Sequence, residues 1–339
     1  MTNRLRVSAV VALLAAGAQP AAADDVADFY KGKTVTIVVG HEPGTGFDVY
    51  ARALARHLRR HVLGNPGIVV QNMNGAGGIV AANWLYNAAP KDGTVLRTFV
   101  YSVPFERLLG NAAARYEPAK FTWIGNMEEG AAVCGVSKAA GVDTFEDMRT
   151  TETIFGGASN NGALVRSALA VRNLLGAKMK VVPGYKGTAS LKIAISRGEV
   201  HGVCALMMST ITSFWRDDYA AGNFFPVLQL SGRTRIGSNI PHADDYVKSD
   251  DDRQLHALVF GVQALGKLYA SAPGVPAARR DALRTALSAT MKDPEFVAEA
   301  TKSQLDISPM TGAEVEGFIA RVSTASSAVI ERTKQAYAP

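Results

Sequence analysis

The sequence predicts an α/β fold with mostly parallel strands and helices on both faces of the sheet. Short apolar runs alternate with segments of helical periodicity from Thr34 to about Leu230. Several of these runs end in glycine- or asparagine-rich corners, and from Pro276 onward the pattern is helical almost throughout. Strands that alternate with helices favour a parallel sheet covered on both sides.

The first unit is a strand at 34–39, a corner at 43–46 and a helix from about Asp48. Apolar residues follow helical spacing at Ala51, Leu54, Ala55, Leu58 and Val62. Arginines fall on the opposite side at Arg52, Arg56, Arg59 and Arg60. One face of this helix is therefore expected to be buried and the other solvated.

The same order repeats along the chain. A strand "GIVVQN" at 67–72 precedes the corner "NGAGG" at 74–78 and an alanine-rich helix. The strand "TVLRTFV" leads to Ser102 and to a helix expected from Pro104. Further on, "TIFGGAS" enters the polar loop "SNNG" and a helix at 163–175 that Gly176 ends, and "KMKVVPGYKG" and "GEVHGVCALM" supply two more strands.

These corners are expected to meet in one cleft, because ligands of open α/β sheets bind at the carboxyl ends of the strands. The two strongest candidates are 43–48 and 74–78. Each places backbone N–H groups at a helix N-terminus, which suits an anion. Each of their glycines is equally compatible with a simple tight turn.

Two familiar nucleotide motifs do not fit the first corner. Gly46 is followed by Phe47 and Asp48, not by the Lys and Ser or Thr of a phosphate loop. A dinucleotide fingerprint needs a glycine at Val49 and an acid near Asn72. What remains is a corner able to hold a carboxylate, with Asp48 expected to cap the helix by accepting from the N–H of Ala51 or a neighbour.

Residues 1–23 have the pattern of a secretory signal. Arg4 and Arg6 precede the apolar run 7–16, and Ala21–Ala23 form a small-residue cleavage site. The run is shorter than the roughly 20 residues of a membrane span, so a soluble, exported, periplasmic protein is expected. Removing this segment changes the net charge from +6 to +4, and no basic stripe indicates nucleic-acid binding.

Cys134 and Cys204 are the two cysteines of the chain. In an exported protein they either form a disulfide or pack as small buried hydrophobes, and sequence leaves both open. His57 and His61 have the i, i+4 spacing of metal ligands, but the arginines around them favour a solvated face. No metal and no cofactor is expected, and no G-x-S-x-G nucleophile motif is present.

The chain resembles the extracytoplasmic substrate-binding receptors of tripartite tricarboxylate transporters in four segments. In chain order these are "VVGHEPGTGFDVYARALARHL", "NPGIVVQNMNGAGGIVAANWLYNAAPKDGT", "VVPGYKG" and "AISRGEVHG". The resemblance runs from Phe29 to about Pro309. It implies a two-lobed periplasmic binding protein of type II with the ligand cleft between the lobes. The expected division is lobe 1 at 24–128 plus 228–339 and lobe 2 at 129–227.

The resemblance also implies the site. Matching positions in the first lobe are Pro43, Gly44, Thr45, Gly46, Phe47, Asp48, Gly75, Ala76, Gly77, Gly78 and Ser102. Those in the second lobe are Ser159, Asn160, Asn161, Gly162, Tyr185 and Met207. Phe47 and Tyr185 either line the pocket or serve ordinary packing.

Three departures from the family pattern bear on the ligand. Thr45 replaces a usual glycine, the loop at Ser159 lacks a Ser-Ser-His run, and Met207 and Met208 replace an Asp-containing turn.

The leading hypothesis is a monomeric receptor that closes around a di-, tri- or aromatic carboxylate and delivers it to a large and a small membrane subunit. A ligand-sensing partner of a signalling protein would share the same fold and pocket. A third hypothesis is an enzyme, which would need an acid, base or nucleophile in these loops. The loops offer mainly Ser102, Ser159, Asn160 and Asn161, which disfavours this hypothesis.

Overall fold

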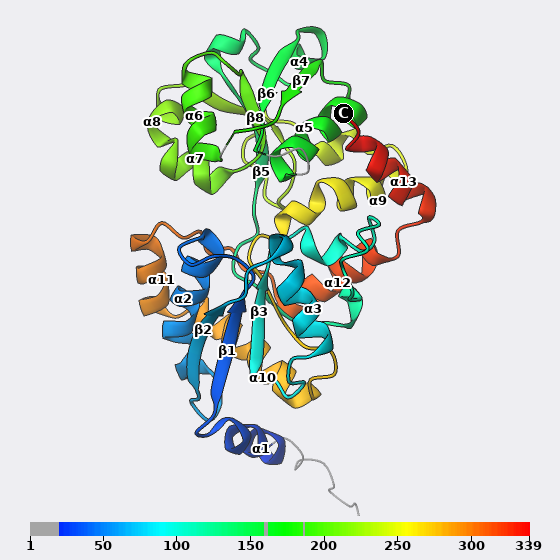
Figure 1. Cartoon of the computed structure of the whole chain (residues 1–339). Coiled ribbons are helices and arrows are strands. Elements are labelled where there is room, and N and C mark those ends of the chain that lie inside the picture. Colours follow the sequence, from blue (N-terminus) through cyan, green and yellow to red (C-terminus); the bar gives the residue numbers. More distant parts are fainter. Residues whose placement is uncertain (1–19, 159–161, 186) are drawn as a thin grey trace, which may run out of the picture.

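The computed structural model describes residues 20–158, 162–185 and 187–339, and it consists of two lobes, each built on a five-stranded sheet (Figure 1). Most of the expected signal segment, residues 1–19, lies outside the described residues. Within the described part of the chain, no helix has the length and apolarity needed to cross a membrane.

The first sheet has the strand order β2-β1-β3-β10-β4. Its strands are β1 (Thr34–Val39), β2 (Gly67–Asn72), β3 (Val95–Phe99), β4 (Thr122–Asn126) and β10 (Leu268–Ser271). The central β1 is parallel to β2 and β3, whereas β10 is antiparallel to both of its neighbours, β3 and β4. Four strands of this sheet therefore point one way and one is reversed.

The second sheet, in the order β7-β6-β8-β5-β9, repeats this arrangement. Its strands are β5 (Ala132–Ser137), β6 (Thr153–Gly156), β7 (Met179–Val182), β8 (Gly202–Met207) and β9 (Phe224–Gln229). β6 is parallel to β7 and β8, and β5 is antiparallel to β8 and β9. The prediction of mostly parallel strands is confirmed. Strands β5 and β10 are the exceptions, because each is the first strand after the chain crosses between the sheets. Each therefore enters its sheet from the edge at which the other strands of that sheet end.

Helices cover both faces of each sheet (Figure 1). Around the first sheet lie α1 (Pro20–Tyr30), α2 (Gly46–Leu58), α3 (Ile79–Asn87), α10 (Ala277–Thr290), α11 (Pro294–Lys302) and α12 (Gly312–Ser323). Around the second lie α4 (Asp147–Thr150), α5 (Ala163–Leu175), α6 (Thr188–Ser196), α7 (Met208–Phe214) and α8 (Arg216–Ala220). Beside the junction of the lobes lie α9 (Asp250–Val259) and α13 (Ser327–Ala336).

Local signals explain several helix ends. Gly176 ends α5 with φ of +76°, as the sequence predicts. Asp293 caps α11 by accepting from the N–H of Glu295 at 2.9 Å, and Pro294 follows it as the first helical residue. The prediction of a helix from Pro104 is wrong, because only a single 3₁₀ turn, Val103–Phe105, forms there.

The predicted faces of α2 are confirmed for the apolar residues and the arginines, but not for the histidines. Leu54 and Leu58 are buried, and Arg56 is exposed. His57 is only 8% exposed, and its Nε2 lies 2.8 Å from a carboxylate oxygen of Glu299 on α11. His61 Nε2 similarly lies 2.7 Å from Asp293. The histidines are thus part of the α2–α11 contact, which sequence spacing alone does not reveal.

The lobes are joined by more than the two connections between the sheets. Sheet membership changes between β4 and β5 and again between β9 and β10. Leu255 and Val259 of α9 and Val329 of α13 pack in the apolar core of the second sheet, whereas Leu258 packs in that of the first. The division at 128/129 and 227/228 stays a prediction, and α9 and α13 form a further bridge at the junction.

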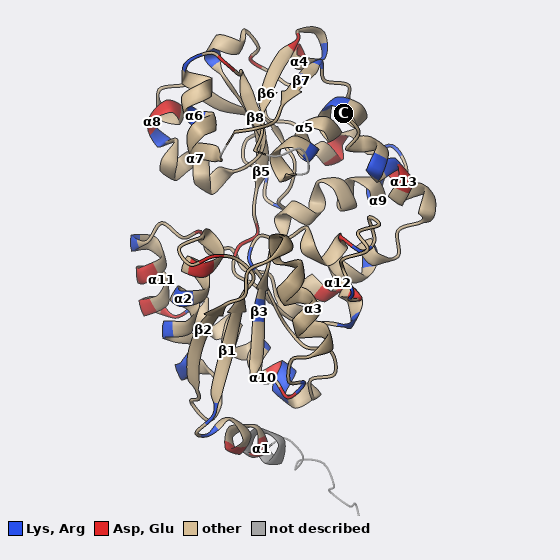
Figure 2. Cartoon of the chain, in the orientation of Figure 1, with Lys and Arg blue, Asp and Glu red and all other residues tan. Residues whose placement is uncertain are grey.

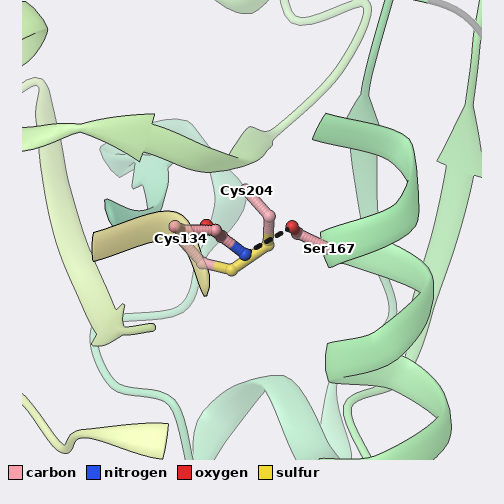
Figure 3. Close-up of a disulfide and its surroundings, with 4 residues drawn as sticks. Cys134, Ser167 and Cys204 are labelled. Atoms are coloured by element: carbon pink, nitrogen blue, oxygen red, sulfur yellow. Dashed lines mark hydrogen bonds between the residues drawn. A yellow bond between two sulfur atoms is a disulfide. The ribbon is translucent and has the colours of Figure 1, made fainter. Parts of the chain in front are cut away.

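The two cysteines are joined in a disulfide (Figure 3). Cys134 lies on β5 and Cys204 on the neighbouring β8, and both are fully buried. Beside them, the Ser167 hydroxyl of α5 accepts a hydrogen bond from Gln263 Nε2 at 3.0 Å. The alternative of two free packed thiols, left open by the sequence, is therefore excluded by the structure.

Candidate functional site

Three strands of the first lobe deliver their loops to one edge of the sheet. In the parallel register Val39 lies opposite both Asn72 and Thr98. The first corner, the second corner and the Ser102 segment therefore leave the sheet side by side. Because β1 starts near α1 at the far end of the lobe, its carboxyl end points toward the other lobe (Figure 1).

The first corner carries unused backbone donors. Thr45 precedes α2, which begins at Gly46, two residues earlier than the sequence predicts, and the Thr45 side chain makes no capping bond. The N–H groups of Gly46, Phe47 and Asp48 donate to no described residue. Open donors in the first turn of a helix form a site for an anion.

Asp48 does not cap α2 as predicted, because it is itself the third residue of the helix. Its carboxylate accepts from the Gly44 N–H at 2.9 Å, from Arg52 Nε at 2.8 Å and from Asn72 Nδ2 at 3.0 Å. The Arg52 bond, helped by those from Gly44 and Asn72, lowers the pKa of Asp48 to about 2 against the opposing effect of burial. Asp48 is thus a positioning residue, and its charge is already compensated.

The second corner has a backbone path that runs through positive φ at four successive residues. The φ values are +140° at Gly75, +46° at Ala76, +62° at Gly77 and +98° at Gly78. A Cβ atom at Gly75 would lie 2.6 Å from the Val80 side chain, whereas one at Gly77 would meet nothing within 4 Å. The N–H groups of Ala76 and Gly77 donate to no described residue. Two corners therefore present five open donors at one edge of the sheet.

Three side chains that sequence reasoning missed surround the first corner. The His41 ring stacks on Phe47, with centroids 4.9 Å apart. Lys267 Nζ lies 5.0 Å from the centre of the Phe47 ring and 2.8 Å from Glu128 Oε2. Lys267 and Glu128 lie in the crossings between the lobes, far from the corner in sequence, so no local pattern indicated them.

In the second lobe, the loops after β6 and β7 are bonded to each other. The Gly184 N–H donates to Ala158 O at 3.0 Å, and the Tyr185 N–H donates to Gly157 O at 3.2 Å. The Tyr185 ring packs next to Gly156 and the apolar cluster around α6. Gly162 directly precedes α5, while Ser159, Asn160 and Asn161 lie outside the described residues.

Met207 ends β8, and its side chain lies over Gly130 at the first crossing between the lobes. Two residues on, the Ser209 hydroxyl of α7 donates to Glu128 Oε1 at 3.4 Å. The end of β8 is therefore placed beside the Glu128–Lys267 pair and not far out in the second lobe.

The two lobes also meet on the Ser102 side. Glu106 of the first lobe and Arg166 of α5 form an ion pair at 3.6 Å. A cavity of about 80 Å³ lies here, and its lining includes Tyr101, Ser102, Glu106, Arg166, Gln263 and Tyr337. The strand-end loops of the two lobes consequently face each other. Within the described residues, no group of three or more His, Cys, Asp and Glu is placed to hold a metal ion.

This arrangement is the two-lobed fold of type II periplasmic binding proteins, in which the strand ends of the two lobes face each other. Solved structures support the fold. A TctC solute-binding protein from Polaromonas matches with a TM-score of 0.70 at 17% identity, over 89% of this chain and 99% of that one. MatC of Rhodopseudomonas palustris, with bound malate, matches with a TM-score of 0.58 at 19% identity, over 90% and 99%. Another R. palustris protein, with adipate, has a TM-score of 0.59 at 19% identity, over 90% and 97%.

Sequence relatives agree with the structural matches. A UPF0065 protein of Agrobacterium vitis is 26% identical over 277 residues, which cover 80% of this chain and 75% of the relative. Protein BugT of Bordetella pertussis is 38% identical over 94 residues, 28% of each chain. No protein-family model matches the sequence. The chain is similar to UPF0065 and Bug proteins, and the predicted resemblance to the receptors of tripartite tricarboxylate transporters is confirmed.

Proposed function

We propose that the protein is a periplasmic receptor that captures a small organic carboxylate between its lobes. The observation that carries this proposal is the set of five open N–H donors at Gly46, Phe47, Asp48, Ala76 and Gly77, all at one edge of the first sheet. Charge-assisted hydrogen bonds from backbone N–H groups are a strong way to hold a carboxylate. Malate and adipate, bound by two proteins of the same fold, are both dicarboxylates, which favours this ligand class.

Several site residues expected from the sequence have distinct roles under this proposal. The Gly44 N–H and the Asp48 carboxylate hold the shape of the first corner. The five N–H groups named above offer donors to the ligand. From the second lobe, Met207 beside the first crossing is the residue we expect to face the ligand, while Tyr185 supports the loop after β7 by packing against the cluster around α6.

A thermal-shift screen over di-, tri- and aromatic carboxylates tests the proposal. A ligand at about 100 times its dissociation constant adds roughly 2.7 kcal/mol to the free energy of unfolding, which is readily detected. Sodium sulfate at matched ionic strength is the control for general salt effects. Stabilisation by a carboxylate and not by sulfate, followed by a calorimetric dissociation constant, is the expected result. No stabilisation by any carboxylate would contradict the proposal.

The cellular setting is part of the same proposal. Residues 1–23 are expected to be a signal sequence, so mass spectrometry of the periplasmic fraction should find Asp24 at the N-terminus. The receptor would then act as a monomer and pass its ligand to a large and a small membrane subunit. Co-purification with those subunits supports transport, whereas co-purification with a sensor protein would support the signalling alternative.

A further inference from the structure

A buried arginine lies directly behind the two corners. Arg97 is the middle residue of β3, and its side chain is completely buried. Arg97 is the basic residue in the sequence of β3, VLRTF. Figure 2 shows this strand as tan with a blue band for Lys or Arg. In the register of the sheet Arg97 lies opposite Val38 of β1 and Ala270 of β10, so it occupies the centre of an otherwise apolar layer.

The guanidinium fills the space between the end of β1 and the second corner. Arg97 Nη2 donates to Gly78 O at 2.6 Å, and the guanidinium carbon lies 3.8 Å from the centre of the Phe99 ring. A Cβ atom at Gly40 would lie 2.8 Å from Nη2, and one at Gly78 would lie 2.9 Å from it. Two glycines therefore make room for this one cation, immediately behind the backbone that carries the open donors.

Among the residues that the structure describes, the charge of Arg97 has no partner of opposite sign. Its Nε and Nη1 atoms are buried without a hydrogen-bond partner, and no carboxylate in the described residues forms an ion pair with it. Burial lowers its pKa to about 9, which still leaves the guanidinium charged at neutral pH. Burial and the Arg97 charge together lower the pKa of the neighbouring His41, which disfavours a second positive charge beside the guanidinium.

A buried cation without an ion-pair partner lowers the stability of the folded protein. An anion bound close to such a cation therefore stabilises the protein. The corners in front of Arg97 are the place where such an anion would be held by backbone donors. Because the guanidinium is wholly buried, its field on a ligand in front of the corner passes partly through protein and is screened less than it would be in bulk water.

We propose that Arg97 supplies the positive charge that draws a carboxylate to the two corners, and that it makes the site selective for a fully ionised ligand. This inference rests on the proposed receptor function and adds the residue that sets the charge of the ligand. Arg97 lies behind the backbone and does not touch the ligand itself, so it is a specificity-determining residue that acts through its field and through its bond to Gly78.

A purely structural role makes a different prediction. If Arg97 only braces Gly78 O and packs on Phe99, then an uncharged residue that keeps a donor should serve equally well. If its charge matters, then a charged residue of different shape should serve better. Arg97→Gln and Arg97→Lys separate these two roles, because the first keeps a donor and loses the charge while the second keeps the charge.

The test uses the mature protein and measures dissociation constants by calorimetry for malate, adipate and the carboxylate that stabilises the wild type most. Arg97→Gln is expected to weaken binding about 10- to 100-fold, as the loss of a nearby buried charge would. Arg97→Lys should remain within about fivefold of the wild type. Arg216→Met, on the exposed helix α8, removes the same net charge and should leave binding unchanged.

Each other outcome overturns the inference. Equal binding by the wild type and Arg97→Gln would exclude a role for the charge while leaving the receptor function intact. Equal losses in Arg97→Gln and Arg97→Lys would show that binding depends on the shape of the arginine side chain and not on its charge. Absence of any carboxylate binding by the wild type would remove the proposed function and this inference together. Arg97→Met provides a second neutral variant if Arg97→Gln does not fold.

Discussion

The side-chain amide of Asn72 donates to Asp48 Oδ1 at 3.0 Å and to His41 O at 2.9 Å. These bonds tie the end of β2 to the first turn of α2, and so fix the first corner from both sides. A dinucleotide-binding protein would carry an acid near Asn72. Here the amide instead orients a carboxylate that belongs to the corner itself. Donors fixed before the ligand arrives reduce the ordering cost of binding.

Replacing Asp48 by Asn should make the free energy of unfolding depend less on pH in the acidic range. The folded-state pKa of about 2 lies below the ordinary value of 3.8, so the unfolded chain binds more protons between these values. The carboxylate therefore contributes stability above about pH 4, and this contribution is lost as the pH falls toward 2. A shift of this size corresponds to about 2 kcal/mol.

Urea unfolding at pH 7 and at pH 2.5 measures this effect. The Asp48→Asn variant should be about 2 kcal/mol less stable than the wild type at pH 7, and the difference should shrink at pH 2.5. Asp217→Asn on the exposed helix α8 is the control and should change stability by less than about 0.5 kcal/mol. A difference that stays constant with pH would contradict the assigned role of Asp48.

Gly46→Asp should stay folded and lose ligand binding. Gly46 does not have a positive φ, and a Cβ atom there meets nothing within 4 Å, so the backbone tolerates a side chain. The new carboxylate would stand at the helix end that is meant to attract one. Loss of two charge-assisted bonds of about 1.5 to 3 kcal/mol each weakens binding by two to four orders of magnitude.

Circular dichroism and calorimetry with the ligand from the screen measure the two parts of this prediction. Gly237→Asp is a matched control, because Gly237 also lacks a positive φ and lies outside both corners. Retained affinity within a factor of about three in Gly46→Asp would mean that the first corner is only a turn.

The unreduced protein should contain no titratable thiol after denaturation, because Cys134 and Cys204 are joined. The disulfide closes a loop with a sequence separation of 70, and loss of such a constraint lowers stability by up to about 4 kcal/mol. Thiol titration in guanidinium with and without reductant measures the pairing, and unfolding of reduced protein measures the stability. Two thiols without reductant would contradict the disulfide.

Glu106→Gln should let the lobes separate more in the absence of ligand. The ion pair with Arg166 joins the two lobes beside the interlobe cavity, and a partly exposed pair of this kind contributes up to about 1 kcal/mol. Small-angle X-ray scattering should show a larger radius of gyration. Arg166→Gln should have the same effect, and the double variant should add nothing further.

Glu331→Gln is the control for the scattering experiment, since its partner Lys334 lies on the same helix α13. It should leave the radius of gyration unchanged. An unchanged radius in Glu106→Gln as well would show that this ion pair does not hold the lobes together.

The position of the two corners of the candidate site could be predicted because their signals are local. Glycines at 44, 46, 75, 77 and 78 occur where an apolar run gives way to a helical pattern, and parallel strands bring such junctions to one edge. The family resemblance follows from the same motifs. Local patterns could not show the hydrogen-bond partners of the Asp48 carboxylate, because one of them, Asn72, comes from the next strand.

The sequence by itself determined the strand and helix alternation, the apolar face of α2 and the position of the two corners, since periodicity and turn composition act within a few residues. Only the tertiary structure decided the reversed strands β5 and β10, the pairing of Cys134 with Cys204, and the placement of Lys267 beside Phe47. It also decided that Arg97 lies behind the second corner, bonded to Gly78 O and without an ion-pair partner among the described residues. These features depend on which distant segments become neighbours, and that follows from the order of strands and the crossings between the lobes.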